Sequence, residues 1–151
     1  MQIHILAFVL ATVVSLLACS GKMPSDLGVA TATLAPCPAS PNCVSSDASD
    51  ADHRVEPFTL AVPAPEAWAV VREEVAKLPR TTVVESTSNY LHAESTSAVF
   101  RFVDDVELHL RVSDESIAVR SASRLGRSDL GVNRRRVERL HAALRARGVV
   151  R

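Results

Sequence analysis

The sequence contains few aromatic side chains and no group of residues spaced like metal ligands. Six of its 151 residues are aromatic: four Phe, one Trp and one Tyr. Proteins that bind single-stranded nucleic acids stack the bases on such rings, so this composition argues against a nucleic-acid partner. His53, His92, His109 and His141 form no zinc-ligand pattern with each other or with the cysteines. We therefore predict no metal and no cofactor.

Catalytic motifs and internal repeats are also missing. The segment Gly126-Arg127-Ser128-Asp129 lacks the second glycine of the Gly-x-Ser-x-Gly turn that carries a hydrolase nucleophile. It also lacks the spacing and the lysine of the phosphate-binding loop of nucleotide hydrolases. No motif identifies a reaction, and we assign no catalytic residue from motifs.

Long apolar runs are absent except at the N-terminus. Residues 5–19 are largely apolar and end in Leu-Leu-Ala-Cys. Such a run, closed by a small residue before Cys, is typical of a bacterial lipoprotein signal peptide, whereas a spanning helix needs about 20 apolar residues. We predict that residues 1–18 are removed and that Cys19 becomes the first residue, bearing palmitate. The absence of Lys and Arg from residues 1–4 favours the alternative, an uncleaved anchor.

The predicted signal peptide places the rest of the chain on the extracytoplasmic side of a membrane, held by lipid. In a two-membrane cell this is the periplasmic face, and Ser20 is compatible with sorting to the outer membrane. Disulfides form in such a compartment, so we predict a bond between Cys37 and Cys43. The rival interpretations of this pair are a metal site and a redox centre, but the spacing fits neither.

The chain has no net charge at pH 7, yet its charges are unevenly distributed. Residues 44–119 contain 14 Asp or Glu and 6 Lys or Arg, a balance of −8. Residues 120–151 contain 10 Arg against two acidic residues, a balance of +8. In one interpretation the basic part pairs with the acidic part, which would add little stability at the surface. In the other, the basic part binds an anion or an acidic partner.

Composition and periodicity divide the chain into three parts. Residues 1–18 are the signal peptide, and residues 19–52, rich in Ser, Ala, Pro, Thr and Asp, are predicted to be a flexible tether that includes the Cys37–Cys43 loop. Residues 53–151 are predicted to form one globular domain.

The predicted domain has the element order β-α-β-β-β-α. A strand over 58–62 precedes a helix from Pro65 to Leu78, which Pro79 ends. Strands are predicted over 82–94 (in one or two pieces), 98–112 and 116–124, and a helix over 134–147. Asn133 is expected to cap this last helix, with Val132 and Val137 as a hydrophobic staple. The fold class is α+β, a small antiparallel sheet with both helices on one face.

Alternation along 98–112 separates an apolar face from a charged one. Phe100, Phe102, Val106, Leu108, Leu110 and Val112 share the first face, and Arg101, Asp105, Glu107, His109 and Arg111 share the second. Arg120 and Arg124 of the next strand lie on the charged face. We expect this face to be solvated and to carry a lattice of opposite charges.

Three blocks of sequence carry a resemblance to a known family. They are residues 34–46, which contain both Cys37 and Cys43, residues 100–107 around the Asp104-Asp105 pair, and residues 119–134. The chain resembles the domain of unknown function 1499 family over residues 34–145. The family is widespread in bacteria and photosynthetic lineages and is often exported or membrane-linked. It has no established activity, so the resemblance implies no particular reaction.

Asp104 is in phase with the apolar residues Phe102 and Val106, so it points toward the core unless a bulge resets the register. A buried carboxylate needs partners, and Ser121, Ser123 or the backbone amides around residues 126–131 are candidates. One interpretation is a structural anchor. The other is a general acid or base.

Residues 126–136 combine two glycines, hydroxyl and amide donors and the start of a helix. Ser128, Asp129, Asn133 and Arg134 belong to this segment. Arginines in a first helical turn oppose the helix dipole, so a negative group should lie nearby. That group is either a carboxylate of the chain, such as Asp105, or a phosphate or carboxylate ligand.

Two functions remain open. The preferred one is a non-enzymatic cell-envelope lipoprotein whose charged sheet face or C-terminal loop binds an envelope protein or an anionic component. The alternative is a hydrolase or transferase that uses Asp104 or Asp129 with Ser121, Ser123 or Ser128. A pocket joining these residues would favour an enzyme, and a fully paired charged surface would favour binding.

Overall fold

The computed structural model describes residues 21–151. The predicted signal peptide and the predicted lipid attachment at Cys19 lie outside the described residues. Within the described part, no helix has the length and apolar character required to cross a membrane.

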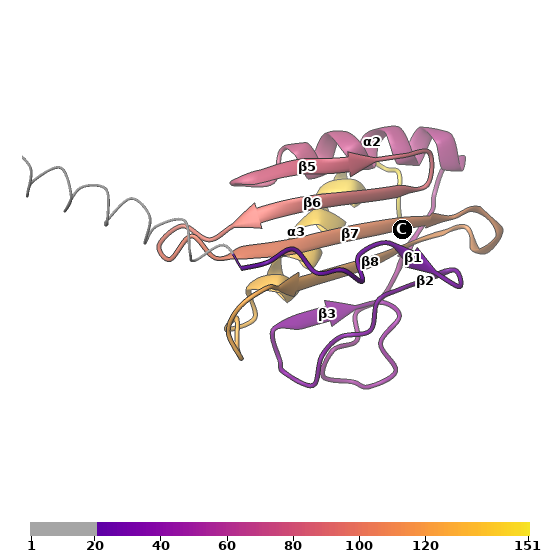
Figure 1. The fold of residues 1–151 in the computed structure, drawn as a ribbon. Coiled ribbons are helices and arrows are strands. Elements are labelled where there is room, and N and C mark those ends of the chain that lie inside the picture. The colour runs from indigo at the N-terminus through magenta and orange to yellow at the C-terminus, as the bar shows by residue number, and fades with distance from the viewer. Residues whose placement is uncertain (1–20) are drawn as a thin grey trace, which may run out of the picture.

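The described chain contains two α-helices, eight strands and one short 3₁₀ helix (Figure 1). In chain order they are β1 (Val29–Ala30), β2 (Thr33–Leu34), β3 (Cys43–Ser45), β4 (Phe58–Thr59), α2 (Ala64–Ala76), β5 (Thr81–Ser86), β6 (Tyr90–Thr96), β7 (Val103–Arg111), η2 (Val112–Asp114), β8 (Ser116–Ser123) and α3 (Val132–Ala146). The predicted α+β class is confirmed, with an antiparallel sheet and both helices on one of its faces.

The main sheet has the strand order β3-β8-β7-β6-β5, and every pairing is antiparallel. The free edge of β8 is shared by two short strands: β3 pairs with Arg120–Ala122, and β4 pairs with Ser116–Ile117. Most of the sheet comes from consecutive hairpins, which the alternating sequence pattern and the short turns predict.

The hydrophobic core lies between the sheet and the two helices. Its sheet side includes Val106, Leu108 and Val119, and its helix side includes Val71 and Leu140, all nearly inaccessible to solvent. Pro65 occupies the first turn of α2, where a backbone N–H would have no partner within the helix. Glu66 lies in the same turn, and its negative charge is stabilised by the positive end of the helix dipole. Apolar residues at helical spacing thus bury one side of each helix against one face of the sheet.

The opposite face of the sheet is covered by an N-terminal arm, residues 21–35, which carries the small β1–β2 hairpin (Figure 1). The backbone N–H of Gly28 donates a 2.8 Å hydrogen bond to Oε1 of Glu107 in β7. Leu34 is buried with Tyr90 and Ala118. The domain therefore has three layers: helices, sheet and arm.

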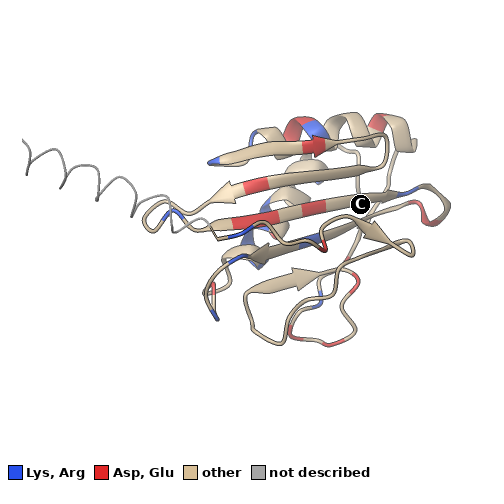
Figure 2. Cartoon of the chain, in the orientation of Figure 1, with Lys and Arg blue, Asp and Glu red and all other residues tan. Residues whose placement is uncertain are grey.

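The expectation of a solvated charged face is wrong. Figure 2 shows acidic residues on β6 and β7 and basic residues on β8. Residues of this face, including His92, Asp105, Glu107, His109 and Arg120, are buried. The alternating pattern separates two faces of a sheet, but it does not show what covers the polar one.

The predicted domain boundary at residue 53 is wrong, because the folded domain begins nearer the N-terminus. Cys43–Ser45 pair with β8 inside the main sheet, and Asn42, Val44 and Ser46 are buried. A strand of three residues has too little periodicity to stand out among the Ser and Pro residues that surround it. The segment expected to be a flexible tether therefore supplies an edge strand and the arm.

The strand predicted from residue 98 begins at Val103 instead. Residues 97–102 form the loop between β6 and β7, where Arg101 has a φ of 57°. Phe100, expected on the buried face, is 67 % exposed. A positive φ interrupts the alternation of side chains, so the periodicity before this point does not continue the strand.

The expected cap and staple of the last helix are wrong. The residue before the first turn of α3 is Gly131, with a φ of 77°, and Asn133 lies inside the helix with its side chain buried. Asp129 does the capping: its two carboxylate oxygens accept hydrogen bonds from the N–H groups of Gly131 (2.9 Å) and Asn133 (2.7 Å). Val132 is the first residue of α3 rather than the residue before its cap, so it cannot form the expected staple.

Candidate functional site

On the helix side of the sheet, Asp104 belongs to a buried polar network with α3. Nη2 of Arg136 donates to Oδ2 of Asp104 at 2.6 Å, and Nη1 of Arg136 donates to Oγ of Ser121 at 2.9 Å. Asp104 is 5 % exposed. Its carboxylate is thus held by a guanidinium rather than by the serines or backbone amides that the sequence suggested.

Asn133 is the hub of the same network. Its Oδ1 accepts from Oγ of Ser121 at 2.6 Å, and its Nδ2 donates to Oγ of Ser123 and to the backbone oxygen of Asn42, both at 3.0 Å. The amide therefore joins α3 to β8 and to the chain entering β3. A buried amide with all these partners fixes the position of the helix.

On the arm side, Asp105 is the centre of a second network. Its carboxylate accepts from Nε2 of His92 at 2.8 Å and from Nε and Nη2 of Arg124 at 2.9 and 2.7 Å. Arg124 also pairs with Glu94. Burial alone would raise the pKa of Asp105, but the hydrogen bonds from His92 and Arg124 outweigh it and lower the pKa below its ordinary value.

Glu107, fully buried, holds the arm to the sheet. Besides the Gly28 N–H, its carboxylate accepts from the Tyr90 hydroxyl at 2.8 Å and from Nη1 of Arg120 at 2.9 Å. Burial and the neighbouring Glu107 charge raise the pKa of Tyr90. Nε of Arg120 is the one buried side-chain nitrogen or oxygen in residues 21–151 without a hydrogen-bond partner.

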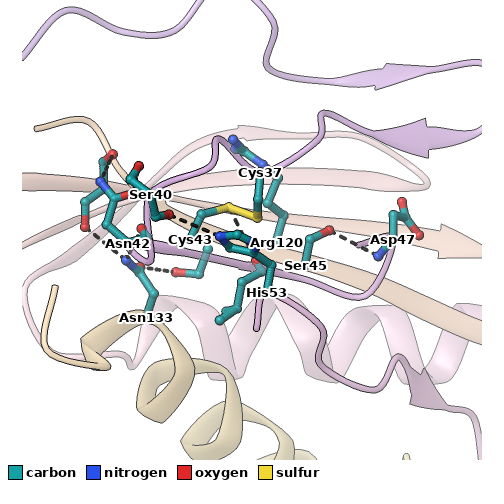
Figure 3. The surroundings of a disulfide bond; sticks show 12 residues. Cys37, Ser40, Asn42, Cys43, Ser45, Asp47, His53, Arg120 and Asn133 are labelled. Atoms are coloured by element: carbon teal, nitrogen blue, oxygen red, sulfur yellow. Dashed lines mark hydrogen bonds between the residues drawn. A yellow bond between two sulfur atoms is a disulfide. The ribbon is translucent and has the colours of Figure 1, made fainter. Parts of the chain in front are cut away.

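The predicted disulfide is confirmed: Cys37 and Cys43 are bonded, with their Cα atoms 5.6 Å apart. Figure 3 shows the bond beside Arg120 and His53, with Asn42 and Asn133 close by. Nδ1 and Nε2 of His53 lie 2.7 Å from Oδ1 of Asp50 and 3.2 Å from the backbone oxygen of Ser40. Cys43 joins the disulfide loop to the sheet through β3, and His53 joins the loop to the segment that follows β3.

Arg134 does not contribute to an anion site. Its Nη1 and Nη2 donate to the backbone oxygens of Arg54 (3.0 Å) and Asp52 (2.8 Å), so it ties α3 to residues 52–54. Ser128 is exposed, and its Oγ accepts from the N–H of Leu130 at 3.3 Å. Residues 126–136, expected to approach a negative group, thus make largely internal contacts.

Arginines of the basic part do line a pocket, which lies beside the first turns of α3. Arg135, Arg136 and Arg139 of α3 line it together with Arg80, which precedes β5. We call this the arginine pocket. Its volume is about 270 Å³, hydroxyls of Thr81, Thr96 and Ser97 contribute to its wall, and none of the described residues that line it is Asp or Glu.

The arginines of this pocket differ in how they are held. Arg136 is fixed by Asp104, Nη1 of Arg135 donates to the backbone oxygen of Leu130 at 2.9 Å, and Nε of Arg80 donates to the backbone oxygen of Thr96 at 3.0 Å. Arg80, Arg135 and Arg139 form no ion pair with any residue in the described range 21–151. Sequence reasoning missed Arg80, because no spacing rule connects residue 80 to the last helix. Arg139 belongs to the basic segment 120–151 but was not singled out.

A second hollow, of about 250 Å³, lies between the β6–β7 loop and the β8–α3 loop. Asp104, Ser123, Ser128 and Asp129 contribute to its wall, together with apolar side chains that include Phe100 and Leu130. It therefore brings together four residues of the predicted site. Among the described residues, neither Ser123 nor Ser128 is hydrogen-bonded to a histidine or a carboxylate through its hydroxyl.

The family of the chain is decided by a match of residues 33–144 to the family model described as "Protein of unknown function (DUF1499)". The chain belongs to the DUF1499 family. No curated protein and no solved structure matches it. The DUF1499 match covers both polar networks, the disulfide and all four arginines of the pocket.

Among the described residues of this DUF1499 protein, no group of three or more His, Cys, Asp or Glu side chains is arranged to hold a metal ion. What the geometry offers is a cationic, hydroxyl-lined hollow beside a helix N-terminus. Guanidinium groups donate paired hydrogen bonds to planar or tetrahedral anions, so the chemistry of this lining suits phosphate or carboxylate groups.

Proposed function

We propose that this DUF1499 protein is a lipid-anchored lipoprotein of the cell envelope that binds an anionic envelope component in the arginine pocket, without catalysing a reaction. The observation that carries the proposal is the meeting of Arg80, Arg135, Arg136 and Arg139 around one hollow whose described lining has no carboxylate. The apolar run before Cys19 supports the membrane address.

The electrostatics of α3 support an anion in this place. Arginines in the first turns of a helix repel the positive end of its dipole, and a bound anion relieves that repulsion. Asp104 and Asp129 are already occupied, by Arg136 and by the backbone N–H groups of α3. Arg80, Arg135 and Arg139, which have no ion-pair partner among residues 21–151, therefore retain their capacity to bind a ligand.

The charged sheet face is a poorer candidate. Asp105, Glu107 and Arg120 are each at most 5 % exposed beneath the arm. Arg120 donates to Glu107, and Asp105 accepts from His92. A ligand could reach them only if the arm left the sheet. The binding surface is therefore assigned to the arginine pocket rather than to this face.

Titration of the purified full-length protein with inorganic phosphate, followed by calorimetry, tests the anion site. We expect saturable binding that weakens with added salt, because salt screens exposed charges. Replacing Arg139 by Gln should weaken it about tenfold or more, the effect of losing a hydrogen bond to a charged group.

The matched control is Arg145→Gln, which removes an exposed arginine near the other end of the same helix. Its affinity for phosphate should equal that of the unmodified protein. Failure to detect saturable binding, or equal weakening by the two substitutions, would contradict the arginine pocket as the binding site.

One observation favours a second candidate, a hydrolase or transferase: the hollow that joins Asp104, Ser123, Ser128 and Asp129. Against it, Oγ of Ser123 accepts from Nδ2 of Asn133, and both carboxylates are held by internal donors. A nucleophilic serine needs an adjacent base, so binding is the preferred function.

A further inference from the structure

We propose that one end of the domain is a membrane-docking surface that rests on a bilayer containing anionic lipids. This end consists of the β6–β7 loop, residues 97–102, and the β8–α3 loop, residues 124–131. The proposal rests on the proposed function in one respect, because it takes the lipid at Cys19 as the anchor.

The apolar side chains that the described part exposes are concentrated at this end. Five of the nine large exposed apolar residues belong to the two loops or to the residue that follows them: Val99 (78 % exposed), Phe100 (67 %), Leu125 (38 %), Leu130 (84 %) and Val132 (39 %). Four of them, all but Val99, line the hollow between the loops, so they form one contiguous patch. A patch of this kind marks an interaction site.

The described chain begins at the same end (Figure 1). Gly21 packs so closely on the β8–α3 loop that a Cβ atom added to it would lie 2.9 Å from Cβ of Arg124 and 3.0 Å from Cγ of Leu125. Cys19 is two residues away, and two residues span at most about 7 Å. A lipid on Cys19 therefore brings the apolar patch to the membrane surface.

Basic residues surround the patch. Lys22, Arg101 and Arg127 are exposed, and none has an ion-pair partner among residues 21–151. The arginine pocket opens at the same end, since Ser97 and Val132 belong to its wall as well as to the apolar hollow. Apolar side chains ringed by Lys and Arg are typical of surfaces that enter the headgroup region of anionic membranes.

This geometry specifies the ligand of the arginine pocket further. With the patch at the headgroup level, the pocket lies beside lipid phosphates, so an anionic phospholipid headgroup is the component we assign to it. Binding would then combine the lipid on Cys19, burial of Phe100 and Leu130, and pairing of phosphate with arginine. The lipid anchors the chain, and the apolar patch with its basic rim sets which face of the domain rests on the bilayer.

Fluorescence quenching by brominated lipids tests the docking surface. Phe100→Trp protein that carries the lipid on Cys19, extracted from membranes, is reconstituted into vesicles of phosphatidylcholine and phosphatidylglycerol whose acyl chains carry bromine. We expect most of the fluorescence of the added Trp to be quenched, with less quenching when phosphatidylglycerol is omitted. Val99→Trp, at the neighbouring exposed position, is the second variant and should behave in the same way.

The matched control is Val112→Trp, which is equally accessible (65 % exposed) but lies in the β7–β8 connection at the other end of the sheet. Its fluorescence should be unquenched, as should that of Trp68, which is buried near Val112. Equal quenching at positions 100 and 112 would overturn the docking surface. If phosphate still binds in that case, the proposed function survives; if the protein does not associate with membranes at all, both proposals fail.

Discussion

Replacing Asp105 by Asn should lower the free energy of unfolding by about 3 kcal/mol at pH 7, as measured by urea denaturation. Removing one partner of a buried ion pair leaves the other charge uncompensated, at a cost of about 3 to 5 kcal/mol. Asp105 is 1 % exposed and faces Arg124 and His92. We expect the lower end of that range, because Arg124 keeps Glu94 as a partner.

The same variant should change the pH dependence of stability. The pKa of Asp105 is lowered in the folded protein from its ordinary value of 3.8, so the unfolded chain binds the proton more readily. The stabilisation by this carboxylate is therefore complete above about pH 4 and is lost as pH falls through the folded pKa. The stability difference between the original protein and Asp105→Asn should narrow in acid.

Glu138→Gln is the control, since Glu138 is exposed on α3 and has no ion pair with the described residues. Its stability should change by no more than about 0.5 kcal/mol, the usual range for surface substitutions. If Asp105→Asn unfolds at the same urea concentration as the original protein, the account of a buried charge network beneath the arm is contradicted.

Replacing Asp104 by Ala should also lower the unfolding free energy by about 3 kcal/mol. Arg136, which is largely buried, would lose its carboxylate and keep only its bonds to Ser121 and Asn133. Asn133→Ala should cost about 1 to 3 kcal/mol, because it leaves Ser121 and Ser123 with unsatisfied groups.

Arg135→Ala should hardly change the unfolding midpoint, because Arg135 is exposed and its bond to Leu130 lies at the surface. Chemical denaturation of the three variants under identical conditions measures the comparison. If Asp104→Ala is as stable as the original protein, Asp104 is a strained functional carboxylate rather than a structural anchor. That result would favour the enzymatic alternative.

Sequence periodicity predicts the parts of this fold whose elements are long. The alternation in β7 and β8 and the apolar spacing in α2 and α3 are each sustained over eight or more residues, which makes the pattern legible. β3 and the arm were missed because short segments held by long-range contacts have no period of their own. The bond from Gly28 to Glu107 joins residues 79 positions apart.

The candidate site could be predicted only in part for the same reason. The excess of arginine after residue 120 indicates an anion or an acidic partner, and three of the pocket arginines belong to that segment. Arg80 reaches the pocket through the pairing of β5 with β6, and Arg136 reaches Asp104 through the packing of α3 on the sheet. No local sequence pattern shows that Arg80 lies near α3 or that Arg136 lies near Asp104.

The lipid on Cys19 is the claim on which both the membrane address and the docking surface depend. Mass spectrometry of the N-terminal peptide from protein extracted from its native membranes tests it directly. The account predicts a peptide that begins at Cys19 and carries diacylglycerol and fatty acid. An unprocessed peptide that begins at Met1, or an unmodified Cys19, would contradict it.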